Sequence, residues 1–252
     1  QTWHCNIGRI FIKMEIITRS RYSIEKVGIF DLSEFEKQGD FSHKVLIDEI
    51  IAQGDRIGQT SNVKAPMTEW NMCYESMEFQ KLGSIIVREG IIPYLGAYYN
   101  NIEDIKKQTY IVNDMWGAEY RGNGDDFTQP HDHRASYCSF SYYLQTPEGS
   151  PPLVFNDMRT EVQPTVGMLV CFKGDYQHSV PKAKHDGSRI MIAGNSTLAN
   201  PENAMVDMLR MRGYEVNERP LFLLMKEFIQ LKNRGTLYIT QNGIDQKQTM
   251  VG

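Results

Sequence analysis

The sequence predicts a mainly β protein, with a sandwich or barrel core flanked by α-helices. Residues 108–195 consist of short apolar runs rich in Val, Ile, Tyr and Phe. Clusters of Gly, Pro, Asp and Asn separate these runs, and closely spaced strands with such turn signals are typical of a sandwich or barrel. Longer segments with helical spacing lie on both sides of this region.

Length and composition fit a single globular domain. At 252 residues the chain can bury one large core, and its 41% hydrophobic and 23% charged residues are ordinary for a globular protein. We therefore predict one compact domain in three parts. Residues 1–109 hold N-terminal strands and supporting helices, residues 110–196 form the β core, and residues 197–252 form a C-terminal helical extension.

The N-terminal part is predicted to begin with strands and one helix. Alternation predicts strands over residues 14–18 and 27–31, and apolar spacing predicts a helix over residues 44–52. Met14 opens the first of these strands, although the chain starts at Gln1. We therefore expect residues 1–13 to be upstream sequence or an added segment.

A longer helical pattern covers residues 70–99. Gly83, Gly90 and Pro93 interrupt it, which predicts two helices rather than one. Met and aromatic side chains form an apolar stripe along this pattern. We assign that stripe to the core and not to a binding surface.

Two helices are predicted after residue 195. Asn200 and Pro201 are typical of a helix start, and Gly213 is typical of its end. The second helix covers about residues 220–233 and has an apolar face. We expect that face to pack on its own domain, and a homodimer contact through the C-terminal helices is the alternative.

Charge and cysteine usage narrow the class of protein. A net charge of −4 and a pI near 5.9 argue against nucleic acid as a partner, and no apolar run approaches the length of a membrane span. The four cysteines are widely spaced without a CxxC pair, which favours reduced thiols. Because nothing at the N-terminus has the pattern of a signal peptide, we expect a cytoplasmic protein.

Three of the six histidines form a pattern that predicts a metal site. His131 and His133 are two residues apart, so on an extended strand both side chains point to the same face. His178 follows a turn and a buried strand over residues 166–172. Asp132 would point to the opposite face of a regular strand, so we favour the three histidines; a β-bulge would let Asp132 replace His133 as a ligand.

Three ligands on a rigid barrel, with further positions left open, are what non-haem iron(II) uses to bind a co-substrate and O₂. The usual set is two histidines and one carboxylate. Three neutral imidazoles do not reduce the 2+ charge of the metal. A co-substrate with a carboxylate would then neutralise more of that charge than it would beside a carboxylate ligand. Of the other histidines, we expect His185 to be solvated in a polar turn, and His4 and His43 have no informative context.

Arg189 lies eleven residues after His178, in a strand-like run over residues 189–193. Its planar guanidinium matches a carboxylate with two parallel hydrogen bonds. Alternation places Met191 and Ala193 on the same face, which suits a partly apolar pocket. The alternative is an arginine on the outer surface of a strand.

The segment of residues 110–196 resembles a known enzyme family. Its motifs include the run from Gly124 to His133 with its His-Asp-His triplet, the run of residues 139–150, His178-Ser179-Val180-Pro181, and the strand that begins at Arg189. In order and spacing they are similar to a group of prolyl-hydroxylase-like 2-oxoglutarate/Fe(II)-dependent oxygenases, common in marine phages and bacteria. If a phage encodes the protein, we expect to find the protein in the cytoplasm of the host cell.

This resemblance implies a double-stranded β-helix (jelly-roll) core with Fe(II) between its sheets. It also implies that 2-oxoglutarate is held by the strand arginine, Arg189, and Tyr120 and Tyr143 become candidate hydrogen-bond donors to it; either tyrosine could equally belong to the core. Trp116 is expected to contribute packing. Met191 stands where the family often has a small hydroxyl residue.

The function that the sequence favours is a 2-oxoglutarate-dependent dioxygenase that uses Fe(II), 2-oxoglutarate and O₂ to hydroxylate a substrate. The substrate is open: a protein or peptide side chain comes first, a small metabolite next and nucleic acid last. Two alternatives remain. One is a three-histidine metal dioxygenase that does not use 2-oxoglutarate, and the other is a non-catalytic jelly-roll binding or virion component.

Overall fold

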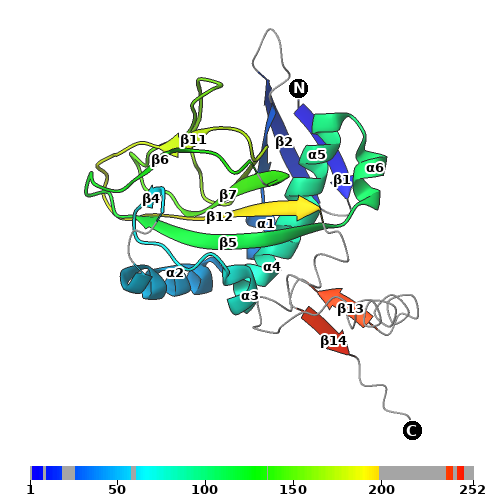
Figure 1. Cartoon of the computed structure of the whole chain (residues 1–252), viewed down its shortest axis with the longest axis horizontal. Coiled ribbons are helices and arrows are strands. Elements are labelled where there is room, and N and C mark those ends of the chain that lie inside the picture. The colour runs from blue at the N-terminus through cyan, green and yellow to red at the C-terminus, as the bar shows by residue number, and fades with distance from the viewer. Residues whose placement is uncertain are drawn as a thin grey trace, which may run out of the picture. The chain divides into compact units, whose positions relative to one another are not determined.

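The computed structural model of the chain (Figure 1) describes residues 2–7, 10–18, 26–57, 61–134, 136–198, 237–240 and 243–246. The chain divides into two compact units, Gln1–Thr197 and Leu198–Gly252. In the second unit the described residues form an antiparallel pair of strands, β13 (Leu237–Thr240) and β14 (Gly243–Gln246). The helices predicted at about residues 200–213 and 220–233, and a homodimer contact through them, lie outside the described residues.

Two β-sheets form the body of the first unit. The larger sheet has the order β1-β2-β3-β10-β7-β12-β5, and the smaller has the order β4-β6-β11-β8-β9. Every pairing whose register is described is antiparallel. The strands of the larger sheet are β1 (Thr2–Ile7), β2 (Ile10–Thr18), β3 (Lys26–Asp31), β5 (Tyr110–Tyr120), β7 (Cys138–Gln145), β10 (Met168–Phe172) and β12 (Arg189–Leu198), and those of the smaller are β4 (Val63–Lys64), β6 (Phe127–His131), β8 (Leu153–Phe155), β9 (Thr160–Val162) and β11 (His178–Val180).

The strands from β5 onward make a double-stranded β-helix. The chain passes from β5 in the larger sheet to β6 in the smaller, back to β7, across to β8 and β9, back to β10, across to β11 and back to β12. Side chains of both sheets meet in one interior cluster, which includes Tyr120, Tyr143, Phe155, Phe172 and Met191. The mainly β prediction with a jelly-roll core is therefore confirmed.

The N-terminal strands extend the larger sheet beyond the jelly roll. β2 pairs with β3, and β3 pairs with β10 in a register that places Phe30 opposite Leu169. The strands predicted at residues 14–18 and 27–31 are confirmed. β2 begins earlier than predicted, at Ile10, and β1 precedes it, so part of the segment before Met14 takes part in the sheet.

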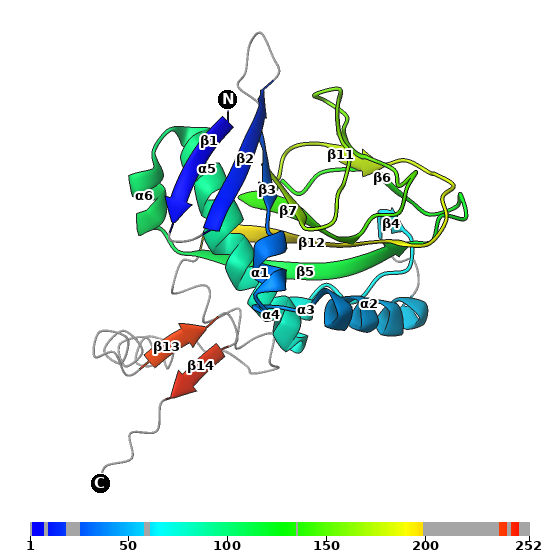
Figure 2. The ribbon, with the colours of Figure 1, turned by 180° about the vertical axis from the view of Figure 1, so that it is seen from behind.

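Helices cover the outer face of the larger sheet. Figures 1 and 2 show α2, α3 and α4 against the face that points away from β6 and β11. Buried side chains of these helices, such as Leu46, Phe79 and Leu82, share one core cluster with Phe140 and Leu169 of the sheet. The helical elements are α1 (Ser33–Lys37), α2 (His43–Ile57), α3 (Met72–Glu75), α4 (Met77–Ile85), the π-helix η1 (Ile86–Ile91), α5 (Ile92–Tyr99) and α6 (Ile102–Lys107).

The helical pattern of residues 70–99 is interrupted, as predicted, but the break lies at Ser76, between α3 and α4, and not near the glycines. α4, η1 and α5 follow one another without an intervening loop, and Pro93 sits in the first turn of α5. Gly90 is needed for close packing, because a Cβ there would overlap the side chain of Leu169 on β10. A glycine that admits a neighbouring strand has the same sequence signature as a helix end, and this one serves the first purpose.

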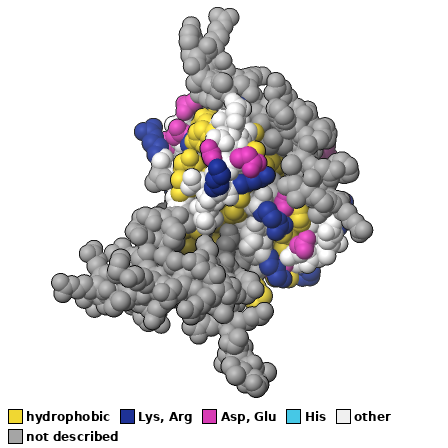
Figure 3. Space-filling view, turned by 90° about the vertical axis from the view of Figure 1, so that its right-hand side faces the viewer, with side chains coloured by type: hydrophobic (Ala, Val, Ile, Leu, Met, Phe, Trp, Pro, Cys, Tyr) yellow, Lys and Arg dark blue, Asp and Glu magenta, His cyan; other side chains and the backbone are white. Residues whose placement is uncertain are grey.

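Charges are interspersed on the surface that the structure describes. Oppositely charged side chains pair along α6, where Lys106 meets Glu103 and Lys107 meets Asp104. Figure 3 shows basic and acidic side chains mixed with apolar ones on one face, without a patch of a single sign. No described helix is long and apolar enough to cross a membrane. Cys73, Cys138 and Cys171 are buried free thiols.

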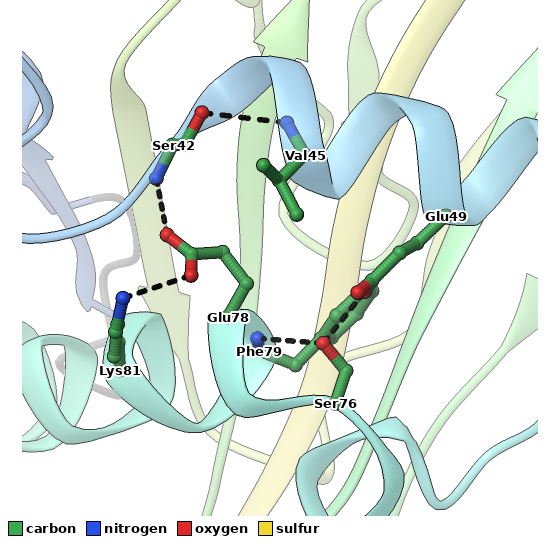
Figure 4. A network of polar contacts seen from close by, with 7 residues as sticks. All are labelled: Ser42, Val45, Glu49, Ser76, Glu78, Phe79 and Lys81. Carbon is green, nitrogen blue, oxygen red and sulfur yellow. Dashed lines mark hydrogen bonds and ion pairs between the residues drawn. The ribbon is translucent and has the colours of Figure 1, made fainter.

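A reciprocal polar network joins α2 to α4 (Figure 4). Ser76 is the N-cap of α4: its Oγ accepts from Phe79 N at 3.3 Å and donates to Glu49 Oε2 of α2 at 2.6 Å. In return, Glu78 of α4 accepts from the backbone N of Ser42, just before α2, at 2.6 Å. Each helix thus supplies a side chain that satisfies polar groups at the start of the other.

We expect Ser76→Ala to lower the free energy of unfolding by about 1 kcal/mol, because the first turn of α4 loses its cap. Urea denaturation measures the loss. Ser84→Ala is the matched control: Ser84 lies in the same helix on its exposed side, and alanine is a better helix former. Equal stability of the wild type and Ser76→Ala would show that the network contributes nothing.

Candidate metal centre

His131 and His178 face each other across two paired strands. The register of β6 and β11 places them directly opposite, and their ring centroids are 4.4 Å apart. Antiparallel partners project to the same side of a sheet, so both rings enter the barrel from the smaller sheet. The ring of Phe172, on the opposite sheet, packs edge-on against His178 at 4.8 Å.

His133 reaches the same point from a turn and not from a strand. β6 ends at His131, so the alternation that we used to orient His133 does not apply, and that part of the reasoning was wrong. Two backbone hydrogen bonds orient the turn instead: His133 N donates to Gly174 O at 2.6 Å, and Ser136 N donates to His133 O at 2.7 Å. The His133 ring lies 4.9 Å from that of His131 and 5.1 Å from that of His178.

The three imidazoles offer a donor set that fits a metal ion. One ligand nitrogen from each histidine lies within 4.8 Å of the others. Metal–imidazole bonds of about 2.0–2.1 Å put two nitrogens on one ion no more than about 4.2 Å apart, so small side-chain movements would close the site. Three protein ligands also leave coordination positions open, as a reactive centre requires.

Hydrogen bonds to backbone carbonyls fix the orientation of two of these rings. Nδ1 of His131 lies 2.8 Å from Gln129 O, and Nδ1 of His178 lies 2.9 Å from Tyr176 O. A carbonyl oxygen can only accept, so each Nδ1 carries the proton and each Nε2 keeps its lone pair. Metal-binding histidines are typically oriented in this way.

Burial keeps the cluster neutral. Burial, helped by the charge of His131, lowers the pKa of His178 from 6.5 to about 3 and that of His133 to about 4. Burial also lowers the pKa of His131, against the hydrogen bond to the backbone of Gln129 and the charge of Asp132. Metal binding requires an uncharged imidazole, and all three rings are uncharged at pH 7.

Asp132 does not join the cluster. Its carboxylate pairs with Nε of Arg134 at 3.0 Å, and it is not one of the residues whose ligand atoms converge. The two residues that flank it point their rings inward, and Asp132 engages the exposed Arg134 instead. The ring that joins His131 and His178 is therefore that of His133, although for a different reason than strand alternation.

Arg189 is buried in the same barrel without a charge partner. Its side chain is 0% exposed, and Nε, Nη1 and Nη2 have no hydrogen-bond acceptor among the described residues. The guanidinium lies over the rings of Tyr120, at 4.6 Å, and Tyr143, at 5.2 Å. The alternative of an arginine on the outer surface is thereby wrong, because the side chain points into the interior.

The two candidate tyrosines differ in what their hydroxyls can do. The Tyr120 hydroxyl shares a hydrogen bond of 2.6 Å with Thr128 Oγ1. The Tyr143 hydroxyl is buried and has no partner among the described residues. Burial raises the pKa of Tyr143, opposed by the positive charge of Arg189, so the hydroxyl keeps its proton and can donate it. Both rings are at the same time part of the interior core.

A small cavity of about 30 Å³ adjoins the histidines. Tyr120 and Thr128 line it together with apolar side chains from both sheets, among them Leu153, Phe172 and Met191. Met191 and Ala193 both border this cavity, as the alternation from Arg189 predicted. The histidine cluster therefore opens into a mostly apolar space.

The remaining histidines and Trp116 differ in how well their predictions hold. The ring of His185 is not fully solvated: Nδ1 is buried, and the backbone of His185 packs against Gly122. His43, for which we had no context, lies with Nε2 2.8 Å from the hydroxyl of Tyr142. Trp116 packs as predicted, with its ring 4.5 Å from that of Trp70. The side chain of His4 lies outside the described part of the chain.

Sequence reasoning missed a polar group beside His133. Asn195 is 5% exposed, its Nδ2 lies 3.5 Å from His133 Nδ1, and the same Nδ2 donates to Asp114 Oδ1 at 2.7 Å. A signal was present: alternation from Arg189 through Met191 and Ala193 puts Asn195 on the inner face of β12. A polar residue at such a position of a buried strand needs a partner.

Comparison with known proteins found likeness only among solved structures. No family model and no curated protein matches the sequence. A viral collagen prolyl hydroxylase from Paramecium Bursaria Chlorella virus-1, solved as a 2OG complex, is similar with 18% identity over 68% of this chain and 94% of that chain, at a TM-score of 0.46. A prolyl-4-hydroxylase from Pseudomonas putida is similar with 13% identity over 67% of this chain and 98% of that chain, at a TM-score of 0.44.

A protein of the 2OG-Fe(II) oxygenase family from Burkholderia pseudomallei is similar with 11% identity over 73% of this chain and 72% of that chain, at a TM-score of 0.38. All of these scores lie below 0.5. At that level the likenesses carry no argument about chemistry, which rests on the site itself.

We expect the metal-free protein to lose stability as the pH falls. The folded pKa values of His133 and His178 lie below 6.5, so protons bind the unfolded chain first, and the stabilisation present above pH 6.5 is lost between about 6.5 and about 3–4. A tenfold difference in proton affinity between the folded and unfolded chains corresponds to about 1.4 kcal/mol. Urea unfolding between pH 7.5 and 4.5 measures the slope, and His178→Gln should flatten it. Identical slopes would refute burial as the cause.

We expect His133→Ala and His178→Ala each to weaken metal binding at least about tenfold. Substituting a residue that only hydrogen-bonds to a metal ligand already lowers metal affinity by about 10–100-fold. Asp132→Asn should retain the affinity of the wild type, because Asp132 pairs with Arg134. His185→Ala is the matched histidine control outside the cluster. Metal content and competitive titration with a chelator test this ranking, and a stronger effect of Asp132→Asn than of His133→Ala would reverse the ligand assignment.

Proposed function

We propose that this protein is a 2-oxoglutarate- and Fe(II)-dependent dioxygenase that hydroxylates a substrate. One observation carries the proposal: the fully buried guanidinium of Arg189, which has no hydrogen-bond partner among the described residues, lies in the same barrel as three convergent imidazoles. The histidines can hold a cation, and the arginine can hold an anion. A co-substrate that chelates a metal at one end and carries a carboxylate at the other satisfies both.

The buried arginine is the more demanding of these two features. A buried charge without a partner costs several kcal/mol of folding free energy, so proteins rarely retain one without a role. Contacts with the faces of Tyr120 and Tyr143 recover part of this cost but satisfy none of the five N–H donors. A carboxylate would accept two of those N–H groups at once.

The other residues of the barrel fit 2-oxoglutarate as well. The Tyr143 hydroxyl is an unused donor beside the guanidinium. Tyr120 can donate to the same carboxylate if Thr128 donates to Tyr120, since either hydroxyl can be the donor of their bond. Leu153, Phe172 and Met191 make the surrounding walls apolar, which excludes water and strengthens these polar contacts.

In this proposal His131, His133 and His178 hold Fe(II), and Arg189 fixes the distal carboxylate of 2-oxoglutarate. Fe(II) with 2-oxoglutarate and O₂ supplies the oxidising chemistry, and the protein supplies orientation. The apolar cavity positions the carbon–hydrogen bond to be attacked and keeps bulk water out. For the substrate we propose a protein or peptide side chain, as the resemblance of residues 110–196 to prolyl-hydroxylase-like enzymes implies.

Anaerobic spectroscopy of the Fe(II) protein, with and without 2-oxoglutarate, tests the proposal. A metal-to-ligand charge-transfer band that appears only with 2-oxoglutarate is expected. Iron binding without such a band would favour a three-histidine dioxygenase that does not use 2-oxoglutarate. Absence of metal binding would favour a non-catalytic jelly-roll component.

We expect Arg189→Ala to raise the dissociation constant of 2-oxoglutarate at least about tenfold. A lost hydrogen bond to a charged group costs about 1.5–3 kcal/mol, and about 1.4 kcal/mol corresponds to one factor of ten. Arg189→Lys should recover only part of the affinity, because an ammonium cannot make the two-pronged contact. Iron content, measured on the same samples, should not change.

Titration of 2-oxoglutarate into the anaerobic Fe(II) protein measures these constants. Equal constants for the wild type and Arg189→Ala would remove the main support for 2-oxoglutarate. Because Arg189→Ala also leaves a cavity, thermal unfolding of each variant checks that the fold persists.

A further inference from the structure

His133 differs from the other two histidines in the group that contacts its Nδ1. His131 and His178 donate Nδ1–H to backbone carbonyls, which can only accept. Nδ1 of His133 faces the side-chain amide of Asn195 at 3.5 Å. An amide has a donor end and an acceptor end, so the tautomer of His133 depends on which end is presented.

The orientation of the Asn195 amide is fixed by two further contacts. Ser139 Oγ donates to Asn195 Oδ1 at 2.7 Å, and Asn195 Nδ2 donates to Asp114 Oδ1 at 2.7 Å. Ser139 and Asn195 are 1% and 5% exposed, so water does not compete for these bonds. The carboxylate of Asp114 can accept but not donate, which holds the NH₂ end of Asn195 toward Asp114 and His133.

This arrangement has a consequence for the ring of His133. The second N–H of the Asn195 amide can only donate to Nδ1, so Nδ1 must present its lone pair. A neutral imidazole carries one proton, which is then on Nε2. His133 is thereby held with the opposite tautomer to His131 and His178, whose Nε2 atoms are free.

We propose that Asp114 and Asn195 set the tautomer of His133 and thereby decide whether this histidine is available as the third metal ligand through Nε2. Both are positioning residues that act through His133. The proposal rests on the proposed metal centre for its functional meaning, while the tautomer itself is a property of the protein without metal.

The same chain of contacts can hold His133 in the ligand form. If Asp114 is neutral, its hydroxyl can donate to Asn195, and the amide can turn its oxygen toward both Asp114 and Nδ1–H of His133. Burial raises the pKa of Asp114, while its hydrogen bond with Asn195 lowers it. Asn113 Nδ2 contacts the other carboxylate oxygen at 3.1 Å, and the thiol of Cys73 is the titratable group that faces Asp114 from α3.

An exchange of the two side chains tests the proposal. The double variant Asp114→Asn/Asn195→Asp keeps the charge and nearly the same atoms, but it moves the acceptor-only group next to His133. Asp at position 195 would accept from Ser139, from the amide at position 114 and from Nδ1–H of His133. The exchange should therefore turn His133 from the Nε2–H to the Nδ1–H tautomer.

Long-range ¹H–¹⁵N correlation spectra of the metal-free protein report the tautomer of each histidine directly. In the wild type we expect Nδ1–H for His131 and His178 and Nε2–H for His133, and in the double variant Nδ1–H for all three. The signals of His131 and His178 serve as internal controls. Asn195→Leu, which removes the amide at similar volume, should leave His133 as a mixture of both tautomers.

Competitive titration with Zn²⁺ measures the effect on the metal site. The double variant should bind Zn²⁺ at least about tenfold more tightly than the wild type. A carboxylate that accepts the second N–H of a metal-binding histidine changes metal affinity by about 10–100-fold. An Nδ1–H tautomer of His133 in the wild type, or an unchanged tautomer in the double variant, would overturn the proposal. A changed tautomer with no metal binding by either protein would support the tautomer assignment and reject the proposed metal function.

Discussion

The pairing of β6 with β11 is the constraint on which the centre depends. These two short strands of the smaller sheet bring His131 and His178 into direct opposition, although 46 positions of the sequence separate them. The register shifts between His178 and Val180, so the regular ladder ends just beyond the histidine pair. β4 on one side and β8 on the other hold the two strands in the sheet, and the larger sheet closes the space behind the rings.

Several buried polar groups inside the barrel destabilise the ligand-free fold, and a bound ligand would remove this destabilisation. Burial keeps three imidazoles neutral, and in the part of the chain that the structure describes it leaves the Arg189 guanidinium without an acceptor and the Tyr143 hydroxyl without a partner. Each of these is unfavourable in the ligand-free fold. Ligands that bind only the folded state add to its stability by mass action, so a metal and a dicarboxylate would stabilise this fold as they bind.

Much of this architecture could be predicted from sequence because it follows from local patterns. Short apolar runs with turn signals predicted a sandwich or barrel, and the family resemblance implied its jelly-roll form. Alternation from Arg189 predicted the inward side of Met191 and Ala193, which border the cavity. Strand alternation, from which we predicted the orientation of His133, does not apply there, because β6 ends two residues earlier, at His131. The backbone of His133 is held by Gly174 and its ring is contacted by Asn195, both distant along the chain, and long-range contacts of this kind leave no local signature.

The five-residue loop between β10 and β11 supports two of the three histidines. Gly174 O accepts from the backbone of His133, and Tyr176 O fixes the ring of His178. No other residue type fits at Gly174, because a Cβ would overlap the carbonyl oxygens of His133 and Ser136. An insertion or deletion in this loop would displace two histidines together, so loop length here is under the same restraint as the histidines themselves. In a redesign of this barrel, the loop and the His-Asp-His turn would have to be transplanted as one unit.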